Sequence, residues 1–372
     1  MSAIKNVIDI LDLSAKEIDS LMDTAEEMAK HPEKYEDALR HRTLAALFFE
    51  PSTRTRLSFE SAMLALGGNV IGFSDAGTSS TTKGESLADT VKVVSGYADI
   101  IAMRHPKEGA TAVACEHAYI PVINAGDGGH YHPTQTLADL LTIRREKGRL
   151  DHLTVGICGD LRYGRTVHSL IDAMARYEDV RFVLISPREL ALPDFVLNGT
   201  LQKNHIPYIE STSLEEVIGT LDVLYMTRVQ KERFDSAKTY ERLKDVYILT
   251  AEKLQAAKTD MIILHPLPRV NEIATEIDSD PRACYFRQTV NGKLMRMALI
   301  LKLLSEKELP DADRRNGISC DGAGAVCTNP HCIVSVERNL PPRFYRDTEE
   351  RPHCAYCDAE VTAQNISRTG NR

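Results

Sequence analysis

The stretch TLAALFFEPSTRTRLSFESAMLALGG, residues 43–68, joins an apolar run to a helical segment through a polar turn. Similar apolar runs, alternating with helical stretches, return at residues 98–103, 120–124, 153–158, 180–186, 222–226 and 261–265. Short apolar runs that alternate with helices predict strands buried on both faces of parallel sheets. We therefore expect an α/β fold with two doubly wound parallel-sheet domains.

The sequence also indicates where these domains end. The polar segment REKGRLDH, residues 145–152, separates a helix that begins near Pro133 from a new strand, and an apolar helix over 292–309 closes the second half. A linker rich in small residues follows. The predicted parts are 1–148, completed by a closing helix 288–309; 149–287; a linker 310–325; and a tail 326–372.

Composition limits the class of protein. The 372 residues are 43% hydrophobic and 26% charged, as in an ordinary globular chain, and the net charge is -8. That charge argues against coating nucleic acid, which needs surplus lysine and arginine. No apolar run is long enough for a membrane helix, and the first residues lack the pattern of a signal peptide. We expect a cytoplasmic protein that binds neither nucleic acid nor membrane.

Candidate site residues follow the apolar runs, because ligands of open α/β sheets bind beyond the carboxyl ends of the strands. After the first run come Ser52, Thr53, Arg54 and Thr55, at the start of a helix. Free backbone N–H groups, hydroxyls and a guanidinium together form a phosphate-type anion site. A capped helix start with solvated arginines explains this stretch alone equally well, but five more strand ends carry Arg, His or Gln, which favours the anion site.

The segment GHYHPTQ, residues 129–135, allows two interpretations. A metal site of Asp127, His130 and His132 is disfavoured, because this segment does not clearly supply a third converging ligand. Its proline opens a helix, which would aim His132 and Gln135 at a ligand. We expect His132 to donate a hydrogen bond to a carbonyl; an incidental histidine in a surface turn is the alternative.

Two further strand ends carry arginines. Arg165 follows GDLRYG, which does not fit the GxGxxG pattern of dinucleotide sites, and Arg228 with Gln230 follows LYMT. Paired arginines suit carboxylates, although a solvated arginine at a helix start competes as an explanation for Arg165. Ser79 and Lys83 lie in GTSSTTKGES, which taken alone reads as a solvated loop. No arrangement requires a covalent intermediate.

Seven motifs occur in the order and spacing of one known family: FFEPSTRTRLSFE, KGESLADT, MRHPKEGA, HPTQTLADL, GDLRYGRTVHSL, YMTRVQKER and HPLPRV. Through them, residues 1 to about 310 closely resemble the catalytic chain of aspartate carbamoyltransferase. The resemblance implies transfer of the carbamoyl group of carbamoyl phosphate to L-aspartate in pyrimidine synthesis, with no catalytic metal or organic cofactor. The first predicted domain would bind carbamoyl phosphate and the second aspartate, with a hinge between them.

The resemblance also implies roles for single residues. Phosphate would be held by Ser52, Thr53, Arg54 and Thr55. The carbamoyl end would meet Arg104, His132 and Gln135, and the aspartate carboxylates Arg165, Arg228 and Gln230, with Leu267 and Pro268 of HPLP contacting the substrates. Arg54, Arg104 and His132 would stabilise charge on the carbonyl oxygen. In this family Ser79 and the catalytic Lys83 reach into a neighbouring subunit's site, which replaces the solvated-loop interpretation and implies a homotrimer.

Two alternative functions remain at this point. Ornithine carbamoyltransferase shares the phosphate loop, but it resembles this chain less, because it carries Cys in place of Pro266 and Ser-Met-Gly in place of TRVQ. Arg228 suits a carboxylate better than a cationic side chain. A catalytically inactive scaffold is the second alternative, and the presence of every motif residue argues against it.

The tail carries Cys327, Cys332, Cys354 and Cys357, two close pairs around two short alternating strands and a proline turn. Four thiolates in this pattern predict a closed, structural Zn²⁺ site without the open position that a catalytic zinc needs. Residues 311–372 hold eight Arg, no Lys and nine acidic residues, which is no surplus for nucleic acid.

The spacing of these cysteines resembles the zinc domain of the separate regulatory chain of aspartate carbamoyltransferase. The short linker leaves no room for that chain's nucleotide-binding domain. Our hypothesis is that this β-rich module stabilises the trimer or joins paired trimers, without sensing nucleotides. The sequence does not show whether this module contacts its own catalytic chain or a neighbouring one.

Overall fold

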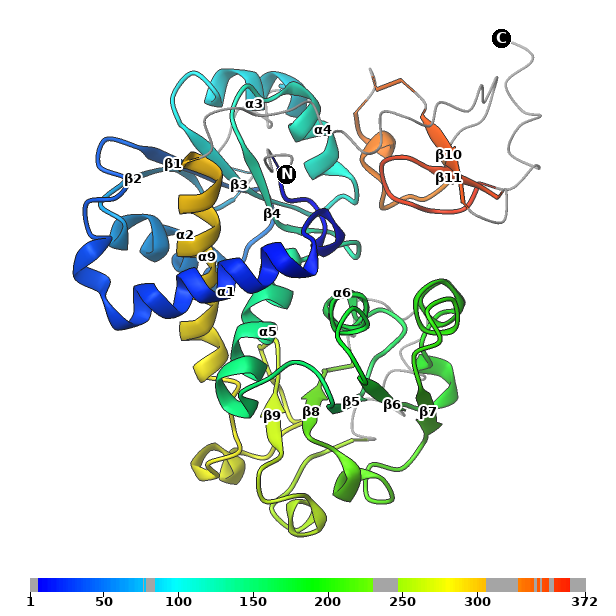
Figure 1. Cartoon of the computed structure of the whole chain (residues 1–372). Coiled ribbons are helices and arrows are strands. Elements are labelled where there is room, and N and C mark those ends of the chain that lie inside the picture. Colours follow the sequence, from blue (N-terminus) through cyan, green and yellow to red (C-terminus); the bar gives the residue numbers. More distant parts are fainter. Residues whose placement is uncertain are drawn as a thin grey trace, which may run out of the picture. The chain divides into compact units, whose positions relative to one another are not determined.

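The computed structural model describes residues 6–75, 77, 84–229, 247–305, 327–337, 340–341, 343–347 and 351–361 (Figure 1). The chain forms two compact units, of which unit 1 is Met1–Asp12, Glu27–Pro133 and Arg296–Arg372, and unit 2 is Leu13–Glu26 and Thr134–Met295. The limits predicted from the sequence, 1–148 and 149–287, stay a proposal beside this division. No described helix has the length and apolar character needed to cross a bilayer.

Unit 1 contains a parallel four-stranded sheet in the order β2-β1-β3-β4. Its strands are β1 (Thr43–Phe48), β2 (Asn69–Phe73), β3 (Ile100–His105) and β4 (Val122–Asp127), and its helices are α2 (Thr53–Ala65), α3 (Leu87–Val94) and α4 (Ala110–His117). Val7 adds a parallel bridge to Ile123 at the β4 edge. Because β1 and β3 are central, the residues that follow them reach the middle of the carboxyl edge.

Unit 2 contains a parallel five-stranded sheet in the order β7-β6-β5-β8-β9. The strands are β5 (Thr154–Cys158), β6 (Arg181–Ile185), β7 (Tyr208–Ser211), β8 (Val223–Met226) and β9 (Ile262–Leu264). The longer helices that belong wholly or partly to it are α1 (Ala15–Lys30), α5 (Pro133–Lys147), α6 (Arg165–Met174) and α9 (Arg287–Ser305). Its short helical segments are η5 (Arg188–Leu190), α7 (Asp194–Val196), η6 (Leu197–Gln202), η7 (Ile218–Thr220), η9 (Lys253–Ala256) and η10 (Thr275–Ser279), whereas η1 (Ile10–Asp12) and η2 (Pro32–Lys34) belong to unit 1.

Local sequence explains where α1 begins. The Glu17 carboxylate accepts from the Ser14 backbone N–H at 2.7 Å, and the Ser14 hydroxyl accepts from the Glu17 N–H at 3.3 Å. This reciprocal capping box satisfies two N–H groups that would otherwise lack partners at the helix start. Within unit 2, Arg145 of α5 then pairs with Glu26 of α1 at 2.9 Å.

The predicted α/β class is confirmed, with two differences in its elements. Strands β2 and β7 were not predicted, because their side chains are mostly exposed or half-buried and they form no continuous apolar run. Helix α9 begins at Arg287, one residue before the closing helix predicted over 288–309 and five before its apolar part at 292, and the last predicted residues, 306–309, lie outside the described part.

The C-terminal module, which we define as the described residues from 327 onward, belongs to unit 1. It contains η11 (Ile333–Ser335) and the antiparallel strands β10 (Phe344–Arg346) and β11 (Pro352–Cys354). The sequence predicted two strands around the proline turn. That was wrong in detail: the segment before the turn forms η11, and both strands come after it.

Candidate active site and candidate metal centre

The first candidate anion site lies at the start of α2. Ser52 is the N-cap of this helix, and its side chain makes no capping hydrogen bond. Thr53 and Arg54 are exposed in the first helical turn, where N–H groups point out of the helix. The pKa of Arg54 is lowered, first by partial burial and then by the nearby positive charge of Arg104. Two guanidinium groups that repel each other at a helix N-terminus favour an anion between them.

Arg104 is held in place from the same edge of the sheet. Its Nη2 lies 3.1 Å from Glu50 Oε2, and its Nη1 donates to the Ala125 carbonyl at 3.3 Å. Burial lowers the pKa of Arg104, and the Glu50 carboxylate partly offsets that effect. Glu50 was missed in the sequence, although its place directly after β1 could have indicated it.

The segment that carries His132 is organised by Asp127 at the end of β4. Asp127 is fully buried and accepts from the N–H groups of Gly109 and Tyr131, both at 3.0 Å. His132 itself is 6% exposed and directly precedes Pro133 at the start of α5. Asp127 therefore braces this loop from inside, which agrees with the disfavoured status of a metal site here.

His130 faces carboxylates with both ring nitrogens. Its Nδ1 lies 3.2 Å from Asp127, and its Nε2 lies 2.9 Å from Asp358 of the C-terminal module. Burial opposes protonation, but the two carboxylates prevail and raise the pKa of His130 to about 10. The ring is therefore an imidazolium that donates to both acids.

In unit 2, the loops that lead to Arg165 and Arg228 are joined at their bases. The Thr227 N–H donates to the Cys158 carbonyl at 2.8 Å, and the Thr227 hydroxyl accepts from the Asp160 N–H at 2.8 Å. Gly159 has φ +121°, and a Cβ there would lie 2.4 Å from the Thr227 carbonyl. Only glycine fits this crossing. Arg165 begins α6 and Arg228 follows β8, so both stand at the carboxyl edge of neighbouring strands.

The HPLP motif forms a rigid turn after β9. The Leu267 N–H donates to His265 Nδ1 at 2.7 Å, which places the ring proton on Nε2, 2.7 Å from Glu272. Leu267 has φ +52°, and the following peptide bond, to Pro268, is cis. The Glu272 carboxylate also accepts from the N–H groups of Val270 and Asn271, at 2.9 and 3.0 Å. The backbone of Leu267 is thus fixed by buried side chains.

Gln135 is half-buried in the first turn of α5 and donates to Asp139 at 2.8 Å. Gln288 donates to the same oxygen of Asp139 at 2.7 Å, and its own carbonyl oxygen accepts from the His265 N–H at 2.8 Å. Sequence reasoning missed Asp139, His265, Glu272 and Gln288. The i,i+4 spacing from Gln135 could have indicated Asp139; no sequence signal singles out the others.

The predicted site residues divide between the two units. Unit 1 carries Ser52, Thr53, Arg54, Thr55, Arg104 and His132, and unit 2 carries Gln135, Arg165, Arg228, Leu267 and Pro268. Ser79, Lys83 and Gln230 lie outside the described residues. Their assignment as site residues stays a prediction throughout.

The four predicted cysteine ligands converge in the C-terminal module. The Cys327 and Cys357 sulfurs are 3.6 Å apart, those of Cys332 and Cys354 are 4.0 Å apart, and all four lie within 4.8 Å of one another. A tetrahedral zinc with Zn–S bonds of about 2.3 Å requires sulfurs about 3.8 Å apart, so the donor set fits. Within the described ranges this is the one such cluster of His, Cys, Asp and Glu.

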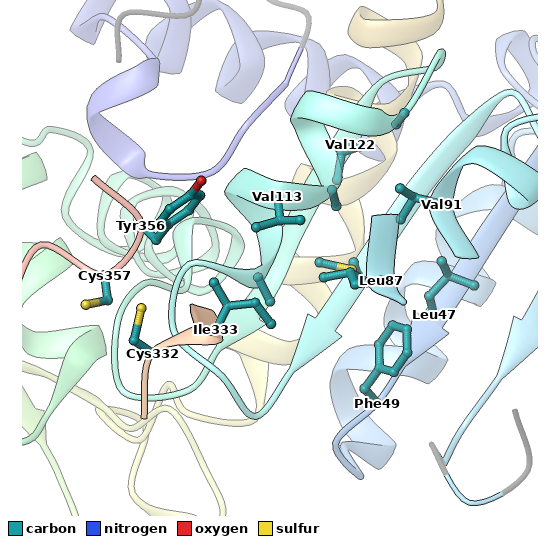
Figure 2. Packing of buried hydrophobic residues seen from close by; sticks show 14 of the residues in the cluster. Leu47, Phe49, Leu87, Val91, Val113, Val122, Cys332, Ile333, Tyr356 and Cys357 are labelled. Atoms are coloured by element: carbon teal, nitrogen blue, oxygen red, sulfur yellow. The ribbon is translucent and has the colours of Figure 1, made fainter. Parts of the chain in front are cut away.

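The module packs against the rest of unit 1 in its own chain. The Glu108 backbone exchanges two hydrogen bonds with the module, from its N–H to His331 and from Ile333 to its carbonyl, both 2.9 Å long. Figure 2 shows Ile333 and Tyr356 beside Val113 of α4, and these residues share one buried core with β1 and α3. The sequence left open whether the module contacts its own chain or a neighbouring one. In the structure it contacts its own chain.

Polar contacts complete this interface. Asn329 donates to the Glu108 side chain at 2.7 Å, and Arg343 pairs with Glu116 of α4 at 2.6 Å. Gly109 has φ +81°, and a Cβ there would lie 2.4 Å from the Tyr356 carbonyl. The loop between Arg104 and α4 is therefore shaped to receive the module.

Comparison with known protein families gives three matches along the chain. Residues 5–145 match the carbamoyl-P binding domain of aspartate/ornithine carbamoyltransferase, and residues 151–303 match its Asp/Orn binding domain. Residues 324–367 match the metal binding domain of the aspartate carbamoyltransferase regulatory chain.

Curated relatives and solved structures give the same family. The aspartate carbamoyltransferase catalytic subunits of Clostridium novyi and Lachnoclostridium phytofermentans are 59% and 61% identical, over 81% of this chain and 98% of theirs. The M. jannaschii catalytic subunit superposes with TM-score 0.77 at 46% identity, covering 82% of this chain and 99% of that one. The Trypanosoma cruzi enzyme in complex with N-(phosphonacetyl)-L-aspartic acid gives 0.76 at 39%, covering 81% and 96%. The chain therefore belongs to the aspartate carbamoyltransferase family, joining a catalytic chain to the metal-binding domain of a regulatory chain.

Proposed function

We propose that the chain transfers the carbamoyl group of carbamoyl phosphate to the amine of L-aspartate, which gives N-carbamoyl-L-aspartate and phosphate for pyrimidine synthesis. The observation that carries this proposal is that Arg54, in the first turn of α2, lies near Arg104 of β3, whose positive charge adds to burial in lowering the Arg54 pKa, so that an anion between the two guanidinium groups is favoured. The names and close similarity of the relatives support the same reaction.

The phosphate end is assigned to Ser52, Thr53, Arg54 and Thr55. The N–H groups at the helix start, the serine and threonine hydroxyls and the guanidinium can together bind a phosphate dianion. Arg104 and His132 are assigned to the carbonyl oxygen, with Arg54 shared between both ends. As the amine attacks the carbamoyl carbon, charge grows on this oxygen, and preformed donors stabilise it there.

The amine substrate is assigned to unit 2. Arg165 and Arg228 stand at the carboxyl edge of neighbouring strands, and Gln230 follows them in the sequence. Two guanidinium groups match the two carboxylates of aspartate, whereas ornithine offers one carboxylate and an ammonium. The departing phosphate can accept the amine proton, so the step needs no covalent enzyme intermediate.

The active assembly is assigned as a homotrimer in which Ser79 and Lys83 complete a neighbour's site. This assignment rests on the family alone, since both residues lie outside the described part. Paired trimers joined through the C-terminal module are a further arrangement that a mass measurement of the native protein tests.

The four cysteines are assigned as ligands of one structural Zn²⁺. Four thiolates leave no coordination position for substrate, so the ion supplies folding energy and no chemistry. It would hold the module in the shape that fits the loop from Lys107 to Gly109. The described contacts support a role in stability.

The proposed function is tested by following phosphate release from carbamoyl phosphate with and without aspartate. Arg54→Ala should lower kcat by about 100-fold or more, as expected for loss of an oxyanion donor. Arg56→Ala is the matched control, because Arg56 lies on the same helix and pairs with Glu60 at 2.6 Å. Aspartate-dependent release that survives in Arg54→Ala would contradict the assignment.

A further inference from the structure

A buried carboxylate in unit 2 gathers hydrogen bonds from three separate segments. Asp139, on α5, has no exposed surface and accepts from Gln135 at 2.8 Å, Gln288 at 2.7 Å and Tyr225 at 3.0 Å. Tyr225 is also fully buried, and burial, followed by the charge of Asp139, raises its pKa well above the usual value. The phenol therefore stays protonated and donates.

This arrangement fixes which way the Gln135 amide faces. An ionised carboxylate only accepts hydrogen bonds, so the atom of Gln135 that faces Asp139 must be the NH₂ group. The Gln135 Oε1 then points away from Asp139. Without the carboxylate, the amide could turn over and present a donor instead.

The same carboxylate also holds Gln288, which continues the hydrogen bonds to His265 and Leu267. Gln288 donates to Asp139 and accepts from the His265 N–H, and His265 Nδ1 accepts from the Leu267 N–H. Gln135 and the Leu267 backbone are thus tied to one hydrogen-bond chain, whose inner members Asp139, Gln288 and His265 are at most 2% exposed.

The chemistry of the donor substrate indicates what these hydrogen bonds could do. A carbamoyl group differs from an acetyl group by an NH₂ in place of a CH₃, and an NH₂ is recognised by acceptors. The other groups assigned to the phosphate and carbonyl ends are arginines, hydroxyls and a histidine, which mainly donate. An amide held with Oε1 outward supplies the missing acceptor.

We infer that Asp139 is a positioning residue that sets the Gln135 amide to accept from the NH₂ of carbamoyl phosphate, and so selects a carbamoyl donor over an acyl phosphate. This inference rests on the proposed function. It assigns to Asp139 the selection of the donor and no direct contact with substrate.

The test compares kcat/KM for carbamoyl phosphate and for acetyl phosphate, each with aspartate, and measures acetyl phosphate also as a competitive inhibitor of carbamoyl phosphate. Asp139→Leu keeps a branched side chain at this position but removes the acceptor. Its preference for carbamoyl phosphate should fall by about 10-fold or more, while acetyl phosphate is used or bound within about 3-fold of wild type.

Asp139→Asn is the conservative partner. Its Oδ1 can keep the bonds from Gln135 and Gln288, and its NH₂ can donate to the Tyr225 hydroxyl, which also hydrogen-bonds Thr166. It should therefore restore the preference to within about 3-fold of wild type, since the geometry of neutral hydrogen bonds is retained. Gln135→Ala, at a half-buried position that folding tolerates, should lose the preference as Asp139→Leu does.

Several results would overturn the inference. A purely structural role for Asp139 would lower both activities of Asp139→Leu by the same factor. An Asp139→Asn protein as unselective as Asp139→Leu, or a Gln135→Ala protein that keeps the wild-type preference, would contradict it equally. A wild-type protein inactive with carbamoyl phosphate and aspartate would instead remove the proposed function, and this inference with it.

Discussion

The imidazole of His130 lies 2.9 Å from the carboxylate of Asp358 and so joins the loop before His132 to the C-terminal module. Tyr131 donates to the same carboxylate at 2.8 Å, and Tyr345 of the module donates to its other oxygen at 3.0 Å. The module is therefore bonded to the loop that carries His132 and, through Glu108, to the loop that follows Arg104 and β3. The C-terminal module is thus a structural part of unit 1.

Replacing His130 by Gln should destabilise the zinc-loaded protein by about 3 kcal/mol, because it leaves Asp127 buried without its cation. The folded pKa of His130 is about 10, above the usual 6.5. The stabilisation is then complete below about pH 6.5 and is lost as the pH rises through about 10. Denaturant unfolding of both proteins between pH 6 and 10 measures this difference.

Arg343→Gln is the control for that experiment, since the Arg343 and Glu116 pair crosses the same interface at its exposed rim. It should cost less than about 1 kcal/mol, with little pH dependence in this range. A stability difference for His130→Gln that grows between pH 6.5 and 10 would contradict the imidazolium assignment.

Gly109→Ala should loosen the module. The new Cβ would need φ +81° and would lie 2.4 Å from the Tyr356 carbonyl, so strain and collision add. We expect a loss of about 2 kcal/mol or more in unfolding free energy and faster proteolysis of the module. Gly148→Ala, with φ +73° and no atom within 4 Å, isolates the strain and should cost about 1 kcal/mol. Equal costs at both positions would show that the module does not press on Gly109.

Cys332→Ser should abolish zinc binding, because a structural site that loses one of four thiolates loses most of its affinity. The purified protein should then carry no zinc by elemental analysis and should melt at lower temperature. Cys284→Ser is the matched control: this thiol is also buried, but it lies in unit 2, where it contacts Arg287. Full zinc occupancy in Cys332→Ser would refute the proposed ligand set.

Glu50→Gln should lower kcat by about 10-fold with little loss of stability. The change removes the charge that holds Arg104 at 3.1 Å, so the guanidinium would be less well placed for the carbonyl oxygen. Glu60→Gln removes the neighbouring half-buried pair with Arg56 and should leave kcat unchanged. Steady-state kinetics measures kcat for both variants, and an equal fall in kcat in Glu50→Gln and Glu60→Gln would contradict this role for Glu50.

The sequence predicted the buried strands and helices that alternate along the chain. Buried strands such as β1 are continuous apolar runs, so the class of fold could be read directly from the sequence. The residues that follow these strands, such as Arg54, stay predicted site residues. The edge strand β2 is mostly exposed, and nothing in its composition separates it from a loop. Glu50, Asp139 and Glu272 act by holding other side chains, and such pairings depend on contacts between segments far apart in the sequence.

The central claim is tested most directly by giving the purified protein carbamoyl phosphate with equal concentrations of L-aspartate and L-ornithine, and identifying the carbamoylated product by mass. Because Arg165 and Arg228 are assigned to the two carboxylates of aspartate, N-carbamoyl-L-aspartate should form with release of one phosphate per product, and citrulline should not accumulate. Citrulline as the main product, or phosphate release without any carbamoylated amine, would contradict the account.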